Sequence, residues 1–238
     1  SRYDAIEEMN GNLIDREELR EYLRPIHDLE RLITRVTYQT ANPRDLIALS
    51  NSVKMIAPLK KILSEFHSPL LVQTEEEMDA LEDIYELIDA SIEEEAPISV
   101  REGGILKNGF KEDIDKLREA RTNGKTWLAD IEKQEREETG IKNLKIKHNK
   151  VFGYYLEVTN SYKNLVPEHY VRRQTLANAE RYITPKLKEL EDMILGAEDK
   201  LVMLEYEYFC EIRKKIADQV VRIQQTAKAV GLLDVLVS

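Results

Sequence analysis

Basic and hydrogen-bonding residues gather in two neighbouring segments in the middle of the chain. The first has the sequence KHNKVFGYYLEVTN over residues 147–160, and the second has YVRRQTLANAERYITP over residues 170–185. Lysine and arginine pair with phosphates, and neutral donors position a protein on a phosphate backbone without distinguishing bases. The candidate phosphate-contacting residues are Lys145, Lys147, His148, Asn149, Lys150, Arg172, Arg173, Gln174, Thr175 and Asn178. Their chemistry indicates non-covalent binding of a polyanion.

These residues also have structural interpretations, which stay open at this point. Lysines on an edge strand prevent sheets from pairing with each other, and Asn178 suits a turn. Neighbouring strand residues point to opposite faces, so at most one of Arg172 and Arg173 faces a polyanion unless the backbone bends. We expect the other arginine to form an ion pair, with Glu180 as a candidate partner. The aromatic residues of the first segment could stack on bases, but the core of a small sheet is their favoured interpretation.

Charge is sorted along the chain. Residues 142–189 contain ten basic and four acidic residues, a net charge of +6, so the remainder of this −10 chain carries −16. Residues 74–95 hold eleven acidic residues and no basic one. We expect this acidic segment to be one helix that begins at Thr74, with its acids on the solvated side. The sorting favours contact between a polyanion and the basic segment alone.

Composition excludes several other classes of function. The chain of 238 residues is 42% hydrophobic, which is enough for a sizeable core, and its single cysteine cannot form a disulfide within the chain. The sequence has no metal-ligand spacing, no activated nucleophile and no apolar run of membrane-spanning length. We therefore expect a soluble cytoplasmic protein without catalytic activity and without contact to a membrane.

Helical patterns occupy most of the chain outside the basic segment. Asn42 followed by Pro43 predicts a helix N-terminus. A long helix is expected from Lys111 to about Thr139, with Gly140 just beyond its end. The helical periodicity stops there, so different elements must carry the basic residues.

The hydrophobic pattern changes to strand-like alternation between residues 142 and 184. One β-hairpin is predicted to turn at Asn149-Lys150, and a second strand pair is predicted to turn around residues 177–179. Beyond Thr184 and Pro185, helix is expected to continue to about Gly231. The predicted fold class is therefore mainly α, with long antiparallel helices and a small β-rich module inserted at their tip.

Several long motifs, in this order, resemble the MutS family of DNA mismatch-repair proteins. The resemblance extends from about Tyr3 to Val237 and implies a piece of a longer protein. In that family the long helices form a lever, and the β-rich module belongs to a clamp that closes on the backbone of duplex DNA. The motifs are LREYLRPIHDLERLITRV, ANPRDLIALSNSVK, NKVFGYYLEVTNS, YVRRQTLANAERYITPKLKELEDMIL and LLDVLVS.

The resemblance implies a division of the chain and a set of partners. Residues 1–121 correspond to the first part of the lever, 122–204 to the clamp insertion with its β-module at about 142–184, and 205–238 to the returning lever helix. The implied partners are duplex DNA and, in the full-length protein, a second copy in a homodimer. A chain bound to DNA would be associated with the nucleoid.

The phosphate-loop motif of the family's ATPase domain does not occur in this sequence. There is no GxxxxGK[ST] phosphate loop, so ATP and Mg²⁺ are expected only in a separate ATPase domain, and the chain itself is expected to need no cofactor. The leading hypothesis is non-sequence-specific clamping of duplex DNA, with a lever that couples the clamp to that ATPase. The alternative is a coiled-coil structural module that mediates association between proteins.

Overall fold

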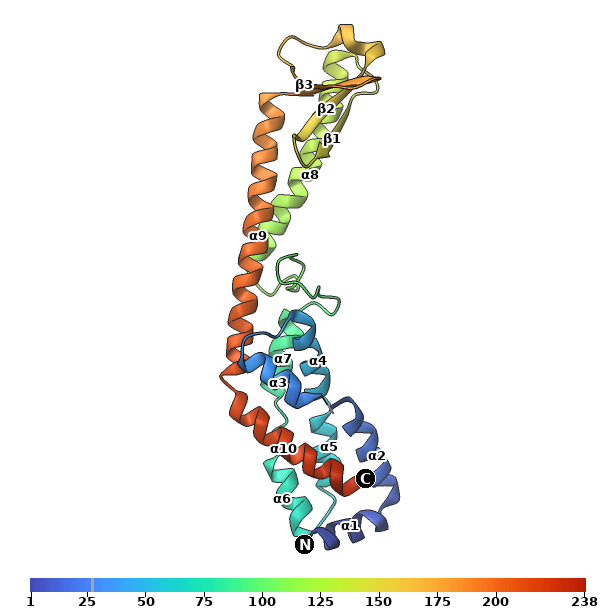
Figure 1. Cartoon of the computed structure of the whole chain (residues 1–238), viewed down its shortest axis with the longest axis vertical. Coiled ribbons are helices and arrows are strands. Elements are labelled where there is room, and N and C mark those ends of the chain that lie inside the picture. The colour runs from blue at the N-terminus through green and yellow to red at the C-terminus, as the bar shows by residue number, and fades with distance from the viewer. Residues whose placement is uncertain (27) are drawn as a thin grey trace. The chain divides into compact units, whose positions relative to one another are not determined.

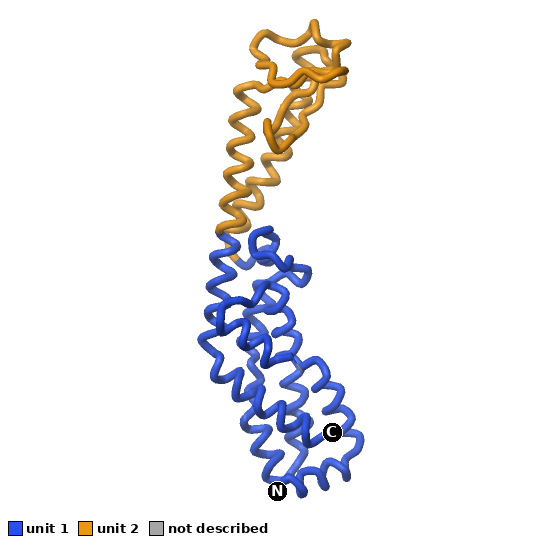
Figure 2. Tube along the Cα trace, viewed as in Figure 1, with its two compact units in different colours: residues 1–110, 204–238 blue, residues 111–203 orange. Residues whose placement is uncertain are grey.

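The computed structural model of the protein describes residues 1–26 and 28–238. The described residues form two compact units (Figure 2). Unit 1 comprises residues 1–110 and 204–238, and unit 2 comprises residues 111–203. Helix α9, Pro185–Ala217, contributes residues to both.

Unit 1 is helical (Figure 1). The predicted helix N-terminus at Asn42 is confirmed. The Asn42 side chain accepts from the Asp45 backbone amide at 2.9 Å, the Asp45 carboxylate accepts from the Asn42 backbone amide at 2.9 Å, and Pro43 is the first residue of the helix. The helices of unit 1 outside α9 are α1 (Arg2–Gly11), α2 (Leu13–Leu23), the 3₁₀ turn η1 (Arg24–Ile26), α3 (Leu29–Thr37), α4 (Pro43–Val53), α5 (Ile56–Leu63), α6 (Pro69–Glu77), α7 (Glu82–Ser91) and α10 (Val220–Val237).

The prediction of one acidic helix beginning at Thr74 is wrong. Thr74 lies inside α6, where its hydroxyl donates to a carbonyl one turn earlier at 2.7 Å. The Lys60 ammonium donates to two carbonyls at the end of α6, at 2.7 and 2.8 Å, and Leu81 then adopts a left-handed conformation with φ 53° before α7 begins. The predicted apolar face is nonetheless buried at Met78, Leu81, Ile84 and Ile88.

The prediction of one helix from Pro185 to Gly231 is also wrong. Helix α9 ends at Ala217, and α10 begins at Val220 and continues through Gly231. Near the break, the Arg222 guanidinium binds Asp79 at 2.8 Å and Asp83 at 2.9 Å. Asp79 lies between α6 and α7, and Asp83 lies in the first turn of α7. A tertiary contact therefore fixes the chain where the sequence has neither glycine nor proline.

Two antiparallel helices support unit 2. Helix α8, Glu112–Thr139, has nearly the predicted bounds, and Gly140 follows it with φ 77°, as its role beyond the helix end requires. Lys186 on α9 donates to Gln134 on α8 at 2.9 Å, and Gly124 on α8 packs directly against Ile194 on α9. The absent side chain of Gly124 permits this close approach between the helices.

The predicted strand pairs are confirmed as one antiparallel sheet in residues 141–184, called the β-module below. Its order is β1-β2-β4-β3, with a 3₁₀ segment η2 (Asn160–Leu165) after β2. The register places Lys145 opposite Glu157, Leu156 opposite Tyr182 and Thr175 opposite Glu180. The strands are β1 (Lys145–Asn149), β2 (Gly153–Thr159), β3 (Val171–Thr175) and β4 (Ala179–Ile183).

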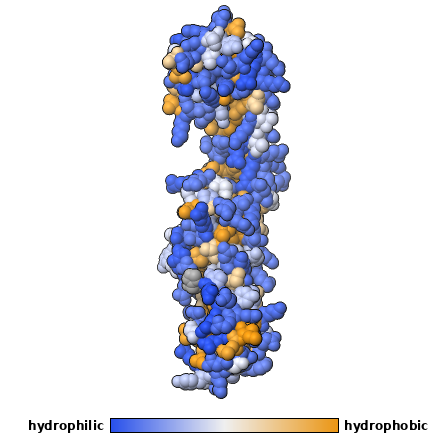
Figure 3. All heavy atoms as spheres, turned by 90° about the vertical axis from the view of Figure 1, so that its right-hand side faces the viewer, coloured by the Kyte–Doolittle hydropathy of each residue, from blue (hydrophilic) through white to orange (hydrophobic). Residues whose placement is uncertain are grey.

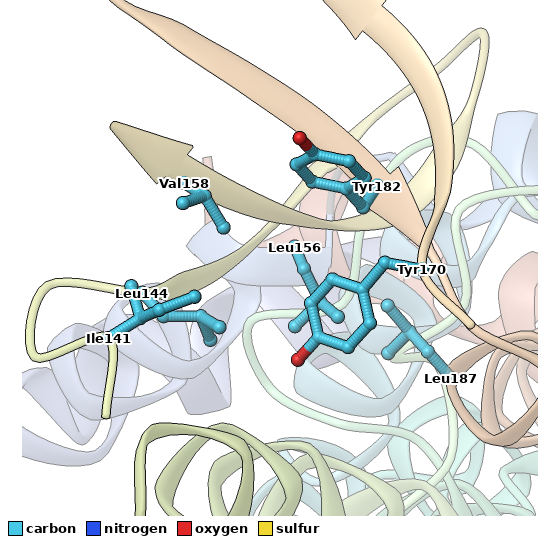
Figure 4. Packing of buried hydrophobic residues seen from close by; sticks show 7 residues of the cluster. All are labelled: Ile141, Leu144, Leu156, Val158, Tyr170, Tyr182 and Leu187. Atoms are coloured by element: carbon cyan, nitrogen blue, oxygen red, sulfur yellow. The ribbon is translucent and has the colours of Figure 1, made fainter. Parts of the chain in front are cut away.

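One face of the sheet is buried against the helices of unit 2. Leu156 of β2 and Leu187 of α9 are fully buried there, and Tyr170 lies close to both (Figure 4). The Tyr170 hydroxyl donates to Glu135 of α8, which satisfies a buried polar pair. The cluster consists of Ile141, Leu144, Leu156, Val158, Tyr170, Tyr182 and Leu187.

The structure confirms a mainly α fold with a small β-module. Hydrophilic residues cover most of the face shown in Figure 3, and hydrophobic residues appear there in small separate patches. Within the described ranges, no helix combines the length and apolarity needed to cross a bilayer. The same residues contain no group of three or more His, Cys, Asp and Glu side chains arranged to hold a metal ion.

Candidate nucleic-acid interface

A row of polar side chains crosses the exposed face of the sheet, one from each strand. The Lys147 ammonium of β1 lies 2.6 Å from Glu157 Oε2 of β2, and Arg181 Nε of β4 lies 3.5 Å from Glu157 Oε1. Arg181 also donates to Gln174 Oε1 of β3 at 2.8 Å and stacks over the Tyr155 ring. The hydrogen bond from Lys147, with a smaller contribution from Arg181, holds the pKa of Glu157 below its ordinary value. Two cations of the sheet therefore share one carboxylate partner.

A second carboxylate, Glu180 of β4, is shared by two further cations. Glu180 is buried and accepts from the Tyr182 hydroxyl, and Lys163 Nζ lies 3.1 Å away. Arg172 Nη1 lies 3.9 Å from the same carboxylate, so the expected ion pair between one arginine and Glu180 is present. The hydrogen bonds from Tyr182 and Lys163 lower the pKa of Glu180, and burial with the Glu180 hydrogen bond raises the pKa of Tyr182 to about 12.

A β-bulge separates the two adjacent arginines. The register moves from Arg172 opposite Tyr182 to Gln174 opposite Arg181, so Arg173 is the extra residue on β3. Its side chain is exposed. The backbone irregularity frees Arg173 from strict alternation, as a bulge does when it redirects a side chain.

Four cations of the β-module are exposed and unpaired. In the part of the chain that the structure describes, Lys142, Lys145, Lys150 and Arg173 have no carboxylate oxygen within 4.0 Å. These four retain a full charge that is available to an external anion. The β-module thus contains both paired and unpaired cations.

Three chain segments meet at one end of the sheet, which we call the polar end. It comprises residues 141–145, 159–165 and 175–179, as the antiparallel register requires. The opposite end, called the hairpin end, comprises residues 149–153 between β1 and β2. Two ends of different composition are therefore available for contact.

Hydrogen bonds between loops hold the polar end together. The Asn143 side-chain amide donates to Thr159 Oγ1 at 2.9 Å. The Asn160 backbone amide donates to the Asn178 carbonyl at 3.0 Å, and the Asn160 side chain donates to the Ala177 carbonyl at 3.1 Å. The polar end is thus an ordered surface whose exposed side chains are mostly asparagine, serine, threonine and lysine.

The ten predicted contact residues do not form one cluster. Lys145, Thr175 and Asn178 lie at the polar end, whereas Asn149 and Lys150 lie at the hairpin end. At about 3.3 Å per strand residue, Lys145 and Lys150 are separated by about 16 Å along β1.

The other predicted residues, apart from Arg173, have internal partners. Lys147, Gln174 and Arg172 are bonded as described above, and the His148 ring lies 4.7 Å from the Tyr154 ring. Asn149 accepts the amides of the next turn at 2.6 and 3.0 Å, so its side chain shapes the hairpin. The edge-strand interpretation of the lysines also remains consistent, since β1 and β3 are the two edges of the sheet.

The list from the sequence omits several exposed residues of the polar end. Among them are Lys142, Asn160 and Lys163. Lys142 and Lys163 contribute to the +6 charge of residues 142–189, and the run NSYKN over residues 160–164 has the composition of a polar turn. Both signals were available in the sequence, but only the antiparallel register places these residues beside Lys145.

A buried carboxylate fastens the hairpin end to α9. Glu191 accepts the Tyr154 amide at 2.7 Å and pairs with Lys188 at 2.7 Å. Gly153 has φ 75°, and a Cβ atom at that position would lie 1.5 Å from Glu191 Oε1. Only glycine satisfies both the backbone conformation and the contact.

The chain is similar in sequence to known proteins of one family. The sequence model of MutS family domain IV matches residues 109–200. Over 238 residues, the chain is 61% identical to the DNA mismatch repair protein MutS of Lachnoclostridium phytofermentans. Over 237 residues each, it is 53% and 49% identical to the proteins of the same name from Caldanaerobacter subterraneus subsp. tengcongensis and Acetivibrio thermocellus. All of the chain is covered in each comparison, whereas it spans 26%, 27% and 27% of the three relatives.

Proposed function

We propose that this chain, which belongs to the MutS family, binds the phosphate backbone of duplex DNA through the polar end of its β-module without distinguishing base sequence. One observation carries the proposal: unpaired Lys142 and Lys145 lie beside neutral donors at an exposed end of the module, while four other cations of the module pair with Glu157 or Glu180. Unpaired Lys150 and Arg173 provide further positive charge on the same module. Such side chains position a protein on phosphates and carry no sequence information.

Burial of the aromatic residues favours a duplex over a single strand. Binding of single strands usually relies on exposed aromatic rings on which bases stack. Tyr155, Tyr170 and Tyr182 are 4%, 6% and 6% exposed, and Tyr154 packs against the core of the module. Their burial supports the core interpretation and leaves electrostatic contact with phosphates as the main mode of binding.

The names of the relatives support a proposal for the role of this chain in a longer protein. These relatives are named as DNA mismatch repair proteins. We extend the proposal to that process: the β-module would hold DNA while the helices of unit 1 couple it to a separate ATPase domain, and two copies would act as a homodimer. The support is the identity over the whole chain together with the charge distribution of the β-module.

The expected affinity of the chain alone is low. A few phosphate contacts give non-specific dissociation constants of about 10⁻⁴ to 10⁻⁶ M near physiological salt. Two linked copies would gain about 10² to 10⁴ in avidity from effective concentration, without any new contact. Weak binding by this chain is therefore consistent with tight binding by a dimer.

A titration over a series of salt concentrations tests the proposal. Fluorescence anisotropy of a labelled duplex of about 30 base pairs should give a log-log slope near −0.9 for each neutralised phosphate, equal on matched and mismatched duplexes. A flat salt response, with self-association detected by ultracentrifugation, would instead favour the coiled-coil association module.

A further inference from the structure

We propose that Glu157 is an internal counterion that occupies Lys147 in place of a DNA phosphate, so that Lys147 contributes little to binding although it is exposed on the sheet. This inference rests on the proposed function, because it concerns the strength of the same phosphate contacts. It assigns different roles to two lysines that the sequence presents as equivalent, Lys145 and Lys147.

The two lysines differ in their partners, although they lie two residues apart on the same face of β1. Lys147 Nζ is 2.6 Å from Glu157 Oε2. Lys145 lies directly opposite Glu157 in the strand register, yet it has no carboxylate oxygen within 4.0 Å in the described part of the chain. Glu157 therefore pairs with Lys147, its diagonal neighbour, and not with Lys145, which lies opposite it.

The position of Glu157 makes it a strong competitor for Lys147. Its side chain is only 17% exposed, and Arg181 bonds its other oxygen. A phosphate that approaches Lys147 must replace one charge-assisted hydrogen bond with another, which leaves little net gain. Since the lysine charge is already compensated, such an exchange also releases few counterions from the DNA.

Arg181 is held too firmly to be released by a change at Glu157. Its guanidinium donates to Gln174 at 2.8 Å, and it lies 4.5 Å from the centroid of the Tyr155 ring. The Arg181 side chain is 20% exposed, whereas the Lys147 side chain is 48% exposed. Removal of the Glu157 charge should therefore make one additional cation, Lys147, available to DNA.

The experiment measures the salt slope of duplex binding for four single variants. Lys145→Gln should make the slope shallower by about 0.9, whereas Lys147→Gln should leave it nearly unchanged. Glu157→Gln should make the slope steeper by about 0.9. The ratio of its duplex affinity to that of the unmodified chain should therefore fall about threefold between about 50 and 200 mM salt. Glu168→Gln is the matched control, because Glu168 is exposed and has no ion-pair partner within the described residues.

A double variant then identifies the cation that is released. Lys147→Gln in the Glu157→Gln background should remove the whole gain in affinity. Circular dichroism should show that each variant keeps the helical signal of the unmodified chain, and the two lysine variants test the proposal without altering Glu157.

The outcomes separate the two proposals. Salt-dependent binding by the unmodified chain, combined with equal slopes for Glu157→Gln and Glu168→Gln, would overturn the role of Glu157 and leave the proposed function standing. Equal effects of Lys145→Gln and Lys147→Gln would overturn it as well. Absence of salt-dependent duplex binding by the unmodified chain would reject the proposed function, and the counterion role with it.

Discussion

Replacement of Gly153 by alanine tests how the hairpin end is fastened to α9. Gly153 has φ 75°, and the added Cβ would lie 1.5 Å from Glu191 Oε1 and 2.5 Å from its carboxyl carbon. Glu191 is 3% exposed and accepts the Tyr154 amide. The variant must therefore adopt a strained backbone and also displace a buried carboxylate.

The magnitude of the effect has two parts. A left-handed conformation costs a residue with a Cβ about 1–2 kcal/mol. Loss of the hydrogen bond between the Tyr154 amide and the charged Glu191 adds about 1.5–3 kcal/mol. Gly153→Ala should thus lower the free energy of unfolding of unit 2 by about 2.5–5 kcal/mol.

Gly140→Ala is the matched control for that experiment. Gly140 also has a positive φ, 77°, but a Cβ there would meet no atom within 4 Å. Only the conformational cost of about 1–2 kcal/mol applies. Urea unfolding followed through Trp127, the single tryptophan of the chain and a residue of α8, reports on unit 2 in both variants. Equal losses of unfolding free energy in Gly153→Ala and Gly140→Ala would refute the contact between Gly153 and Glu191.

Two further predictions concern unit 2. Gly196→Ala should raise the unfolding free energy of unit 2 by about 0.4–1 kcal/mol, since a Cβ there meets open space. Gly124→Ala should be about 1–3 kcal/mol less stable than Gly196→Ala, because its Cβ would lie 2.5 Å from Ile194 Cγ1. Thermal melts that show the same change in stability for both variants would contradict this prediction. Unit 2 should also lose stability as pH rises from 10 to about 12, because the folded state keeps Tyr182 protonated beyond its ordinary pKa of 10.0, and Tyr182→Phe should reduce that loss in urea unfolding at each pH.

Local patterns in the sequence were sufficient to predict the elements that carry the candidate interface. Alternating residues predicted both strand pairs, and Thr184-Pro185 predicted the start of α9, where the Leu187 amide donates to Thr184 Oγ1 at 3.2 Å. These features depend on neighbours a few residues apart. Their prediction therefore required no knowledge of tertiary contacts.

Features that depend on distant residues could not be predicted in this way. The break before α10 involves Arg222 and two acids about 140 residues earlier in the chain. No local signal marks it, because no glycine or proline stands at residues 217–219. The apolar face of the acidic segment was predicted correctly, because it depends only on the spacing of apolar residues, but the interruption between α6 and α7 depends on Lys60.

The candidate interface shows the same limit. The sequence supplied its charge and residue types, but pairing depends on register and on the bulge at Arg173. Lys145 and Lys147 cannot be distinguished until Glu157 is placed between β1 and β4. The polar end likewise unites three segments that are separated in the sequence.

The most direct test of DNA binding by the polar end compares two double variants in the salt titration. Lys142→Gln with Lys145→Gln removes two unpaired charges from the polar end, and Lys125→Gln with Lys133→Gln removes two exposed charges from α8. The polar-end variant should have a salt slope shallower by about 1.8, with the same change on matched and mismatched duplexes, while the α8 variant keeps the slope of the unmodified chain. Equal changes in both variants would contradict binding at the polar end.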